Sequence, residues 1–181
     1  MAMALHVPLY TVDDLDRFPD DGNRYELLDG VLLVTPAPAA VHQLVASRIQ
    51  GELISALQKP GLAHVVGPGA VVRKPRTQLQ PDILVYSASY TPRTDWPKIK
   101  DHWLAVEVLS PSSRVYDRKF KRDAYFALGV QQVWLVDWHN EVIEVSREPG
   151  KFRRQREELR WRTPADGVMV SIDLRDAFAG L

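Results

Sequence analysis

The run "HWLAVEVLSPSS", residues 102–113, places one carboxylate, Glu107, inside a segment that otherwise has the composition of a buried strand. An ionised carboxylate is expensive to remove from water, and it is rarely buried unless another group pairs with it or a metal binds it. The segment therefore predicts a strand in a hydrophobic core, and it also predicts a partner for Glu107. The fold must supply both.

Composition limits the classes of protein that the chain can belong to. With 181 residues, 45% of them hydrophobic, we expect a single domain over residues 1–181. Basic and acidic residues each number 23, so any nucleic-acid binding must come from local patches. The absence of cysteine excludes disulfides and thiol nucleophiles. Without a leader-like start or a long apolar run, the protein is expected to be cytoplasmic, with no membrane contact.

The first half of the chain predicts a short acidic helix over residues 12–18, then a hairpin, a longer helix and two strands. "RYELLDGVLLVTP" resembles two strands around the turn dipeptide Asp29 and Gly30, and its first half carries Glu26. Residues 39–58 have helical periodicity, and His42 falls on their apolar arc. "AHVVGPGAVVRK" and "QPDILVYS" predict the strands, with Asp82 at the start of the second.

The second half predicts a helix over residues 114–128, preceded by the capping serines of "SPSS". Its apolar face is expected to comprise Tyr116, Phe120, Ala124 and Ala127. "VQQVWLVDW" and "EVIEVSRE" predict strands, "KFRRQREELRW" one strand or hairpin arm, and "SIDLRDAF" a closing helical turn. The pattern favours the α/β (α+β) class, with a mixed central β-sheet flanked by helices and an N-terminal β-hairpin region.

Charged residues near the predicted core indicate a hydrolytic site. Asp82 heads one strand, Glu107 lies inside another, and the next helix carries Lys119 and Lys121. Magnesium takes oxygen ligands and often only one or two carboxylates, with water and phosphate oxygens completing its shell. An ammonium nearby can orient the attacking water and offset charge in the transition state. These residue types predict metal-dependent hydrolysis.

Several motifs, in this order, resemble the Uma family of restriction-endonuclease-like proteins, a branch of the PD-(D/E)XK nuclease superfamily. They are "QPDILV" with Asp82, "VEVLSPSS" with Glu107, and "DRKFKRDAYFALGVQQVWLVD" over residues 117–137. The resemblance implies a restriction-endonuclease-like core in which Asp82 and Glu107 bind magnesium or manganese and a lysine completes the site. In the superfamily's usual pattern that lysine lies two residues after the acid, where this chain has Leu109.

The family's own pattern moves the lysine to the following helix, with a spacing that Asp117, Lys121 and Tyr125 match. The resemblance therefore assigns the role to Lys121, although helical projection does not separate it from Lys119. The upstream "RYELLDGVLLVTPAP" motif, followed by His42 and Gln43, also resembles the family's N-terminal signature. Accessory roles are implied for Glu26, His42, Gln43, Gln80 and Tyr125.

Each candidate also has a purely structural explanation. Asp82 could be an exposed turn residue after a proline, and Glu107 could form a buried salt bridge, for instance to Lys121. The helix lysines could lie on a solvated face. Glu26 could be an exposed cross-strand partner, and His42 a hydrogen-bonded core residue.

The stretch "KFRRQREELRWR" interleaves six cations with two aromatic residues and could follow a phosphate backbone. Its candidate nucleic-acid contacts, together with the helix lysine, are Lys119, Arg153, Arg154 and Arg156. A charged face balanced by Glu157 and Glu158 is an equally open explanation.

These features predict a magnesium-dependent phosphodiesterase that hydrolyses DNA without a covalent enzyme intermediate. Superfamily members frequently act as dimers, so a homodimer is expected. The alternative is a catalytically inactive nuclease-fold module that binds nucleic acid or a protein partner.

Overall fold

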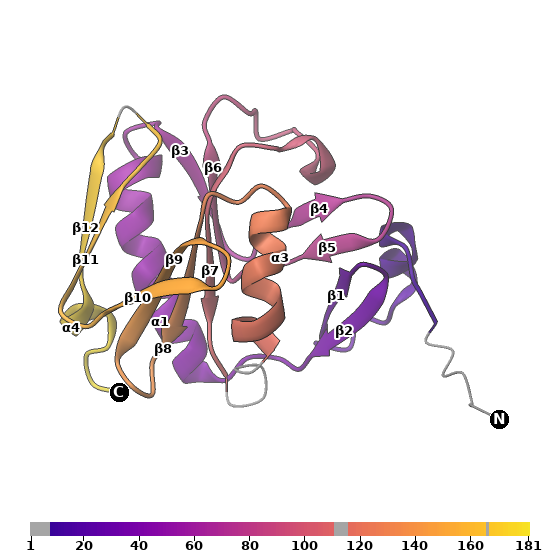
Figure 1. Ribbon diagram of the computed structural model, residues 1–181, viewed down its shortest axis with the longest axis horizontal. Coiled ribbons are helices and arrows are strands. Elements are labelled where there is room, and N and C mark those ends of the chain that lie inside the picture. Colours follow the sequence, from indigo (N-terminus) through magenta and orange to yellow (C-terminus); the bar gives the residue numbers. More distant parts are fainter. Residues whose placement is uncertain (1–7, 111–115, 166) are drawn as a thin grey trace.

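The computed structural model describes residues 8–110, 116–165 and 167–181, which form three β-sheets and several helices (Figure 1). The strands are β1 (Arg24–Leu28), β2 (Val31–Thr35), β3 (Ala63–Val66), β4 (Val71–Arg73), β5 (Thr77–Leu79), β6 (Ile83–Ser87), β7 (His102–Val108), β8 (Gln132–Asp137), β9 (Val142–Glu148), β10 (Lys151–Gln155), β11 (Glu158–Arg162) and β12 (Met169–Asp173). The helices are η1 (Val12–Arg17), α1 (Ala40–Leu53) continuing as the π-helical η2 (Ile54–Gln58), η3 (Trp96–Lys98), the π-helical η4 (Asp117–Lys121) continuing as α3 (Arg122–Ala127), and α4 (Leu174–Ala177).

The largest sheet has six strands in the order β10-β9-β8-β7-β6-β3. Its neighbouring strands are antiparallel except for β7 and β8, which run parallel with Glu107 opposite Leu135. A parallel pair needs a crossover connection, and η4 with α3 forms part of it. This connection carries the helix over the sheet beside the end of β7.

Two hydrophobic clusters cover the two faces of this sheet. One contains α1, the β11–β12 hairpin and α4, and the other contains Tyr125 of α3 and residues of the four-stranded sheet (Figure 1). From Leu104 onward the side chains of β7 and of the residue after it alternate between them, so that Val106 lies in the first cluster while Ala105 and Leu109 lie in the second. Glu107 has the parity of the second set and therefore points toward α3.

The four-stranded sheet, in the order β2-β1-β5-β4, begins with the predicted hairpin. Asp29 and Gly30 have φ angles of 49° and 88°, as a two-residue turn of type I′ requires. β1 pairs with β5 through Leu27 and Gln78. The arrangement holds β1 beside α3, so that residues far apart in sequence meet at the end of β7 (Figure 1).

The predicted α/β class is confirmed, but two predicted strands are each divided. The segment over residues 63–74 forms β3 and β4 in different sheets. Between them the chain passes so close to β6 that a Cβ atom on Gly67 would lie 2.6 Å from the Asp82 carbonyl oxygen. The "KFRRQREELRW" segment likewise forms β10, which pairs with β9, and β11, which pairs with β12. Leu159 and Trp161 draw β11 away because they are buried in the α1-side core.

The predicted capping residues Ser112 and Ser113 lie outside the described residues. Within the described part of the chain, no helix has the length and apolar character needed to cross a membrane.

Candidate functional site

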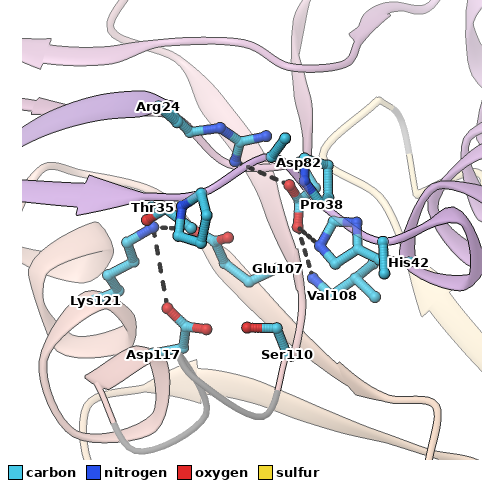
Figure 2. Close-up of a pocket in the computed structure, with 13 residues that line it drawn as sticks. Arg24, Thr35, Pro38, His42, Asp82, Glu107, Val108, Ser110, Asp117 and Lys121 are labelled. Carbon is cyan, nitrogen blue, oxygen red and sulfur yellow. Dashed lines mark hydrogen bonds and ion pairs between the residues drawn. The ribbon is translucent and has the colours of Figure 1, made fainter. Parts of the chain in front are cut away.

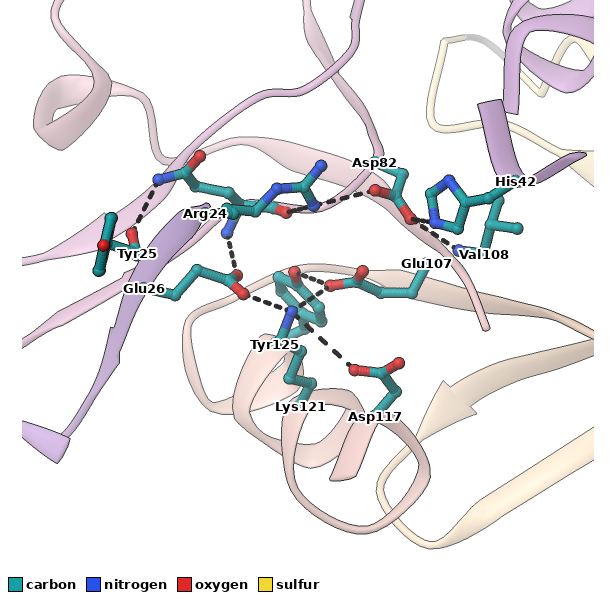
Figure 3. A network of polar contacts seen from close by, with 11 residues as sticks. Arg24, Tyr25, Glu26, His42, Asp82, Glu107, Val108, Asp117, Lys121 and Tyr125 are labelled. Atoms are coloured by element: carbon teal, nitrogen blue, oxygen red, sulfur yellow. Dashed lines mark hydrogen bonds and ion pairs between the residues drawn. The ribbon is translucent and has the colours of Figure 1, made fainter. Parts of the chain in front are cut away.

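Asp82 lies directly before β6 and is only 8% exposed. Its Oδ2 atom accepts the Val108 backbone N–H at 2.8 Å and lies 3.1 Å from His42 Nε2, while Arg24 Nη1 donates to Oδ1 at 2.9 Å (Figure 3). Burial raises the pKa of this carboxyl, but the hydrogen bond and charge of His42, the Arg24 guanidinium and the Val108 amide together hold it below its usual value. Asp82 is therefore a buried, ionised acid, and the interpretation of Asp82 as an exposed turn residue is excluded.

Glu107 lies beside Asp82 because of the register between β6 and β7. Ile83 pairs with Val106, so one further step along the antiparallel ladder brings Asp82 opposite Glu107 on the same face. Both side chains line one pocket (Figure 2).

The partners of Glu107 come from the helix above it. Its Oε1 atom accepts the Tyr125 hydroxyl at 2.5 Å and lies 3.2 Å from Lys121 Nζ. Burial raises the pKa of Glu107 well above its ordinary value, and repulsion from Asp82 adds to this, outweighing the attraction of Lys121. Glu107 therefore keeps its proton to a higher pH than an ordinary glutamate does.

Lys121 lies among three carboxylates with a residual exposure of 5%. Its Nζ atom is 2.7 Å from Glu26 Oε2, 3.2 Å from Glu107 Oε1 and 3.9 Å from Asp117 Oδ1 (Figure 3). Burial alone would lower the pKa of this amine, but the surrounding carboxylates raise it above its ordinary value. Lys121 is accordingly an ammonium at neutral pH.

The helix that carries Lys121 presents a charged face to the protein interior. Asp117, Lys121 and Tyr125 are buried, whereas Lys119 is exposed and Phe120 is 52% exposed. The predicted apolar face was therefore wrong for Phe120, and also for Ala127, which is exposed. The physical reason is that the buried acids at the strand ends attract the ammonium inward, and η4 is a π-helical turn of the kind common at functional sites.

Glu26 is fully buried on β1, so it is not an exposed cross-strand residue. Its Oε1 atom accepts the Gln80 backbone N–H at 2.7 Å, and the Gln80 side chain donates to the Tyr25 carbonyl at 3.1 Å. Gln80 thereby fixes β1 to the residues just before β6. Glu26 contacts the site through its ion pair with Lys121.

The pocket formed by these residues has a volume of about 230 Å³. Its wall includes a strap over residues 35–39 that joins β2 to α1 (Figure 2). The complete lining is Arg24, Thr35, Pro36, Ala37, Pro38, Ala39, His42, Asp82, Glu107, Val108, Ser110, Asp117 and Lys121.

The pocket residues that were absent from the sequence-based candidates are Val108, Ser110, Arg24, Asp117 and those of the strap. Arg24 and Glu26 are two apart on one strand and therefore share a face, a signal that the alternation of β1 contains. Asp117 is four residues before Lys121 and shares its helix face. Residues 35–38 of the strap fall within the "RYELLDGVLLVTPAP" motif, but these small, uncharged residues carry no independent signal of a site.

The predicted accessory and nucleic-acid contacts divide into two groups. His42 belongs to the pocket wall and Gln80 and Tyr125 support it, whereas Gln43 is exposed on α1. The four predicted nucleic-acid contacts are all exposed, and none of them lines the pocket; they are Lys119, Arg153, Arg154 and Arg156.

The donor set suits a hard divalent cation although no preformed cage is present. Among the described residues, no group of three or more His, Asp or Glu side chains is arranged to hold a metal. Magnesium and manganese accept one or two carboxylates with water in the other positions, and Asp82 and Glu107 face the same pocket. Positive charge there would offset the burial and the repulsion from Asp82 that raise the pKa of Glu107. The residues present therefore fit such a cation.

Comparison with known proteins places the fold and the family. The sequence model of the Uma2 family, described as "Putative restriction endonuclease", matches residues 12–175. A crystal structure described as a "putative nuclease belonging to DUF820", from Anabaena variabilis ATCC 29413, is similar with a TM-score of 0.71 and 20% sequence identity, covering 93% of this chain and 97% of that one. No curated protein matches the chain.

Proposed function

The chain belongs to the Uma2 family, whose description is "Putative restriction endonuclease", and on this basis we propose that it is a metal-dependent endonuclease that hydrolyses phosphodiester bonds of DNA. The observation that carries the proposal is that Asp82, Glu107 and Lys121, from separate elements, line one pocket. An ionised buried acid, a second acid beside it and one ammonium can hold a divalent cation and stabilise the charge that develops in phosphodiester hydrolysis.

Magnesium or manganese would be held by Asp82 and Glu107. When bound, the cation supplies positive charge to the phosphate oxygens and increases the acidity of a coordinated water. Asp82 is ready for this role because His42, Arg24 and the Val108 amide keep it ionised and fix its orientation. Glu107 would bind the cation in its ionised form, and the Tyr125 hydroxyl that donates to it fixes its orientation.

Lys121 positions the attacking water and stabilises negative charge that develops on the phosphate. Its raised pKa keeps it protonated at neutral pH, so it serves as a hydrogen-bond donor and not as a general base. Glu26 and Asp117 hold the ammonium at the pocket edge.

The substrate in this proposal is DNA, and a homodimer would present two such pockets to its two strands. Exposed arginines on β10 supply local positive charge in a chain whose net charge is zero.

The test is cleavage of supercoiled plasmid by the purified protein with magnesium, manganese, calcium or chelator. We expect nicking with magnesium or manganese, and a loss of at least about 100-fold in Asp82→Asn and Glu107→Gln. Lys119→Met is the matched control, because that lysine is exposed on the same helix and should retain activity. Absence of cleavage with every metal and substrate would contradict the proposal.

A second candidate, a nuclease-fold module that binds without cutting, is favoured by one observation. Lys121 already compensates buried carboxylates, as it would in a purely structural ion network. Calorimetric titration with manganese separates the two functions. Binding that Asp82→Asn abolishes while the fold is retained supports the endonuclease, whereas no metal binding together with tight DNA binding supports the inactive module.

A further inference from the structure

The outer edge of β2 has none of the features that normally prevent a strand edge from pairing with another chain. Its sequence, Val31–Thr35, has no charge and no proline. Val31 is 42% exposed and Val34 is 51% exposed. No described residue pairs with this edge, and Figure 1 shows β2 at the border of its sheet. An exposed apolar edge of this kind is a template for strand addition.

The other edges of the two larger sheets are protected. β10 carries Lys151, Arg153 and Arg154 and has a register irregularity, two common devices against edge pairing. On β3 the Gln58 side chain accepts the Val65 backbone N–H at 2.8 Å. β4 is short, and its Val71 and Val72 are buried. The contrast shows that β2 differs from the edges that the same fold keeps closed.

Among the residues that the structure describes, the backbone groups of β2 that have no partner are those of Leu32 and Val34. The two-residue turn makes Leu28 and Val31 a hydrogen-bonded pair, and such pairs alternate along an antiparallel ladder. The N–H and C=O groups of Leu32 and Val34 therefore point away from β1. They are spaced to bind an identical strand running in the opposite direction.

We infer that β2 is the interface at which two copies of this chain form a closed homodimer, through antiparallel β2–β2 pairing about a two-fold axis at Leu33. In this register Leu32 of each copy exchanges backbone hydrogen bonds with the partner's Val34. The side-chain pairs are apolar or uncharged, so no like charges meet, as they would if β10 paired with itself.

The pairing also connects the two candidate sites. Thr35 ends β2 and begins the strap that lines the pocket. In the proposed register the partner's Val31 lies beside Thr35, so each copy supports the entrance strap of the other. The interface thereby specifies the homodimer of the proposed function, but it does not depend on cleavage.

The test is the molar mass in solution, measured by analytical ultracentrifugation across a concentration series. The wild-type protein should reach twice the chain mass of 20.5 kDa. Val34→Lys should raise the dimer dissociation constant at least tenfold, because it places a charge within the proposed β2–β2 interface. Met169→Lys is the control, since Met169 is also 51% exposed but lies on β12.

A second variant tests the backbone pairing itself. Val34→Pro removes an N–H that makes no bond within one chain, and proline is tolerated at such outward positions of edge strands. It should therefore leave the monomer folded by circular dichroism and abolish the dimer. A monomeric wild type, a mass above that of a dimer, or dimers unaffected by both Val34 variants would overturn the inference. None of these results depends on metal or DNA, so the endonuclease proposal is tested separately.

Discussion

Replacing Lys121 by methionine removes the ammonium that compensates two buried acids while keeping a side chain of similar length. The Nζ atom lies 2.7 Å from Glu26 and 3.2 Å from Glu107, and both carboxyls are at most 3% exposed. Breaking a buried ion pair by removing one partner costs about 3–5 kcal/mol, because the other charge stays buried and unpaired. We expect Lys121→Met to lower the free energy of unfolding by this amount at pH 7.5.

The loss should depend on pH in a defined direction. The pKa of Glu107 is already raised in the folded protein, so folding binds a proton and stability falls as pH rises from about 4.5, the ordinary value, through the folded pKa. Without Lys121 the pKa of Glu107 rises further, and the fall with pH becomes larger. The difference between variant and wild type should therefore grow as pH rises through the folded pKa of Glu107.

Urea denaturation followed by tryptophan fluorescence measures both effects, with Lys119→Met as the exposed control. Adding Glu26→Gln to Lys121→Met removes one of the unpaired charges, so the double variant should be more stable than Lys121→Met alone. A stability loss equal to that of Lys119→Met, or one that does not change with pH, would refute the reasoning. If cleavage is found, Lys121→Met should reduce it by about 100-fold or more under conditions where the variant is folded.

Three further predictions concern the support of the site and the core. Gly67→Ala places a Cβ atom 2.6 Å from the Asp82 carbonyl oxygen, so it should lower stability by about 1–3 kcal/mol and weaken manganese binding by calorimetry, whereas Gly51→Ala, with open space around it, should do neither. Tyr125→Phe removes a buried hydroxyl donor and should cost about 1–3 kcal/mol in urea denaturation; an unchanged midpoint would show that this hydrogen bond contributes nothing. His102 is 1% exposed, and burial, followed by the charge of its neighbouring lysine, lowers its pKa to about 4 from 6.5. The folded protein, in which His102 is neutral, therefore loses up to about 3 kcal/mol of stability as pH falls from 6.5 to 4. His102→Leu should remove this part of the pH dependence of the free energy of unfolding.

Local signals explain the parts of the fold that were predictable. The Asp29–Gly30 dipeptide specifies a tight turn whatever surrounds it, and the turn forms as expected. The arc over residues 39–58 identifies the buried face of α1, including His42, because an apolar stripe on an amphipathic helix faces the core. The division of residues 63–74 between two sheets was not predictable, because it depends on the close passage of Gly67 over β6. Periodicity describes single elements, and that passage is a contact between elements.

The candidate site was harder to predict where polarity and burial disagree. Asp82, Glu107 and Lys121 were placed near one another by motif resemblance, while the rule that apolar residues face inward assigned Phe120 to the interior instead. The rule fails here because the interior at this point contains acids, and a buried ammonium with several carboxylate partners is more stable than an unpaired one. Arg24 was missed because its partner Asp82 is 58 residues away, and no pattern within one element connects the two.

The position of the lysine follows from the packing of β7 against α3. Leu109 has the same parity as Glu107, but it is 1% exposed and packed in the cluster that contains Tyr125. A lysine at that position would have to bury its stem where α3 already fills the space. The π-helical turn instead brings the ammonium to Glu107 from the helix that faces the strand. The same helix therefore covers the core and carries the lysine. The carboxylate near the end of β7 is therefore stabilised by the element that covers it.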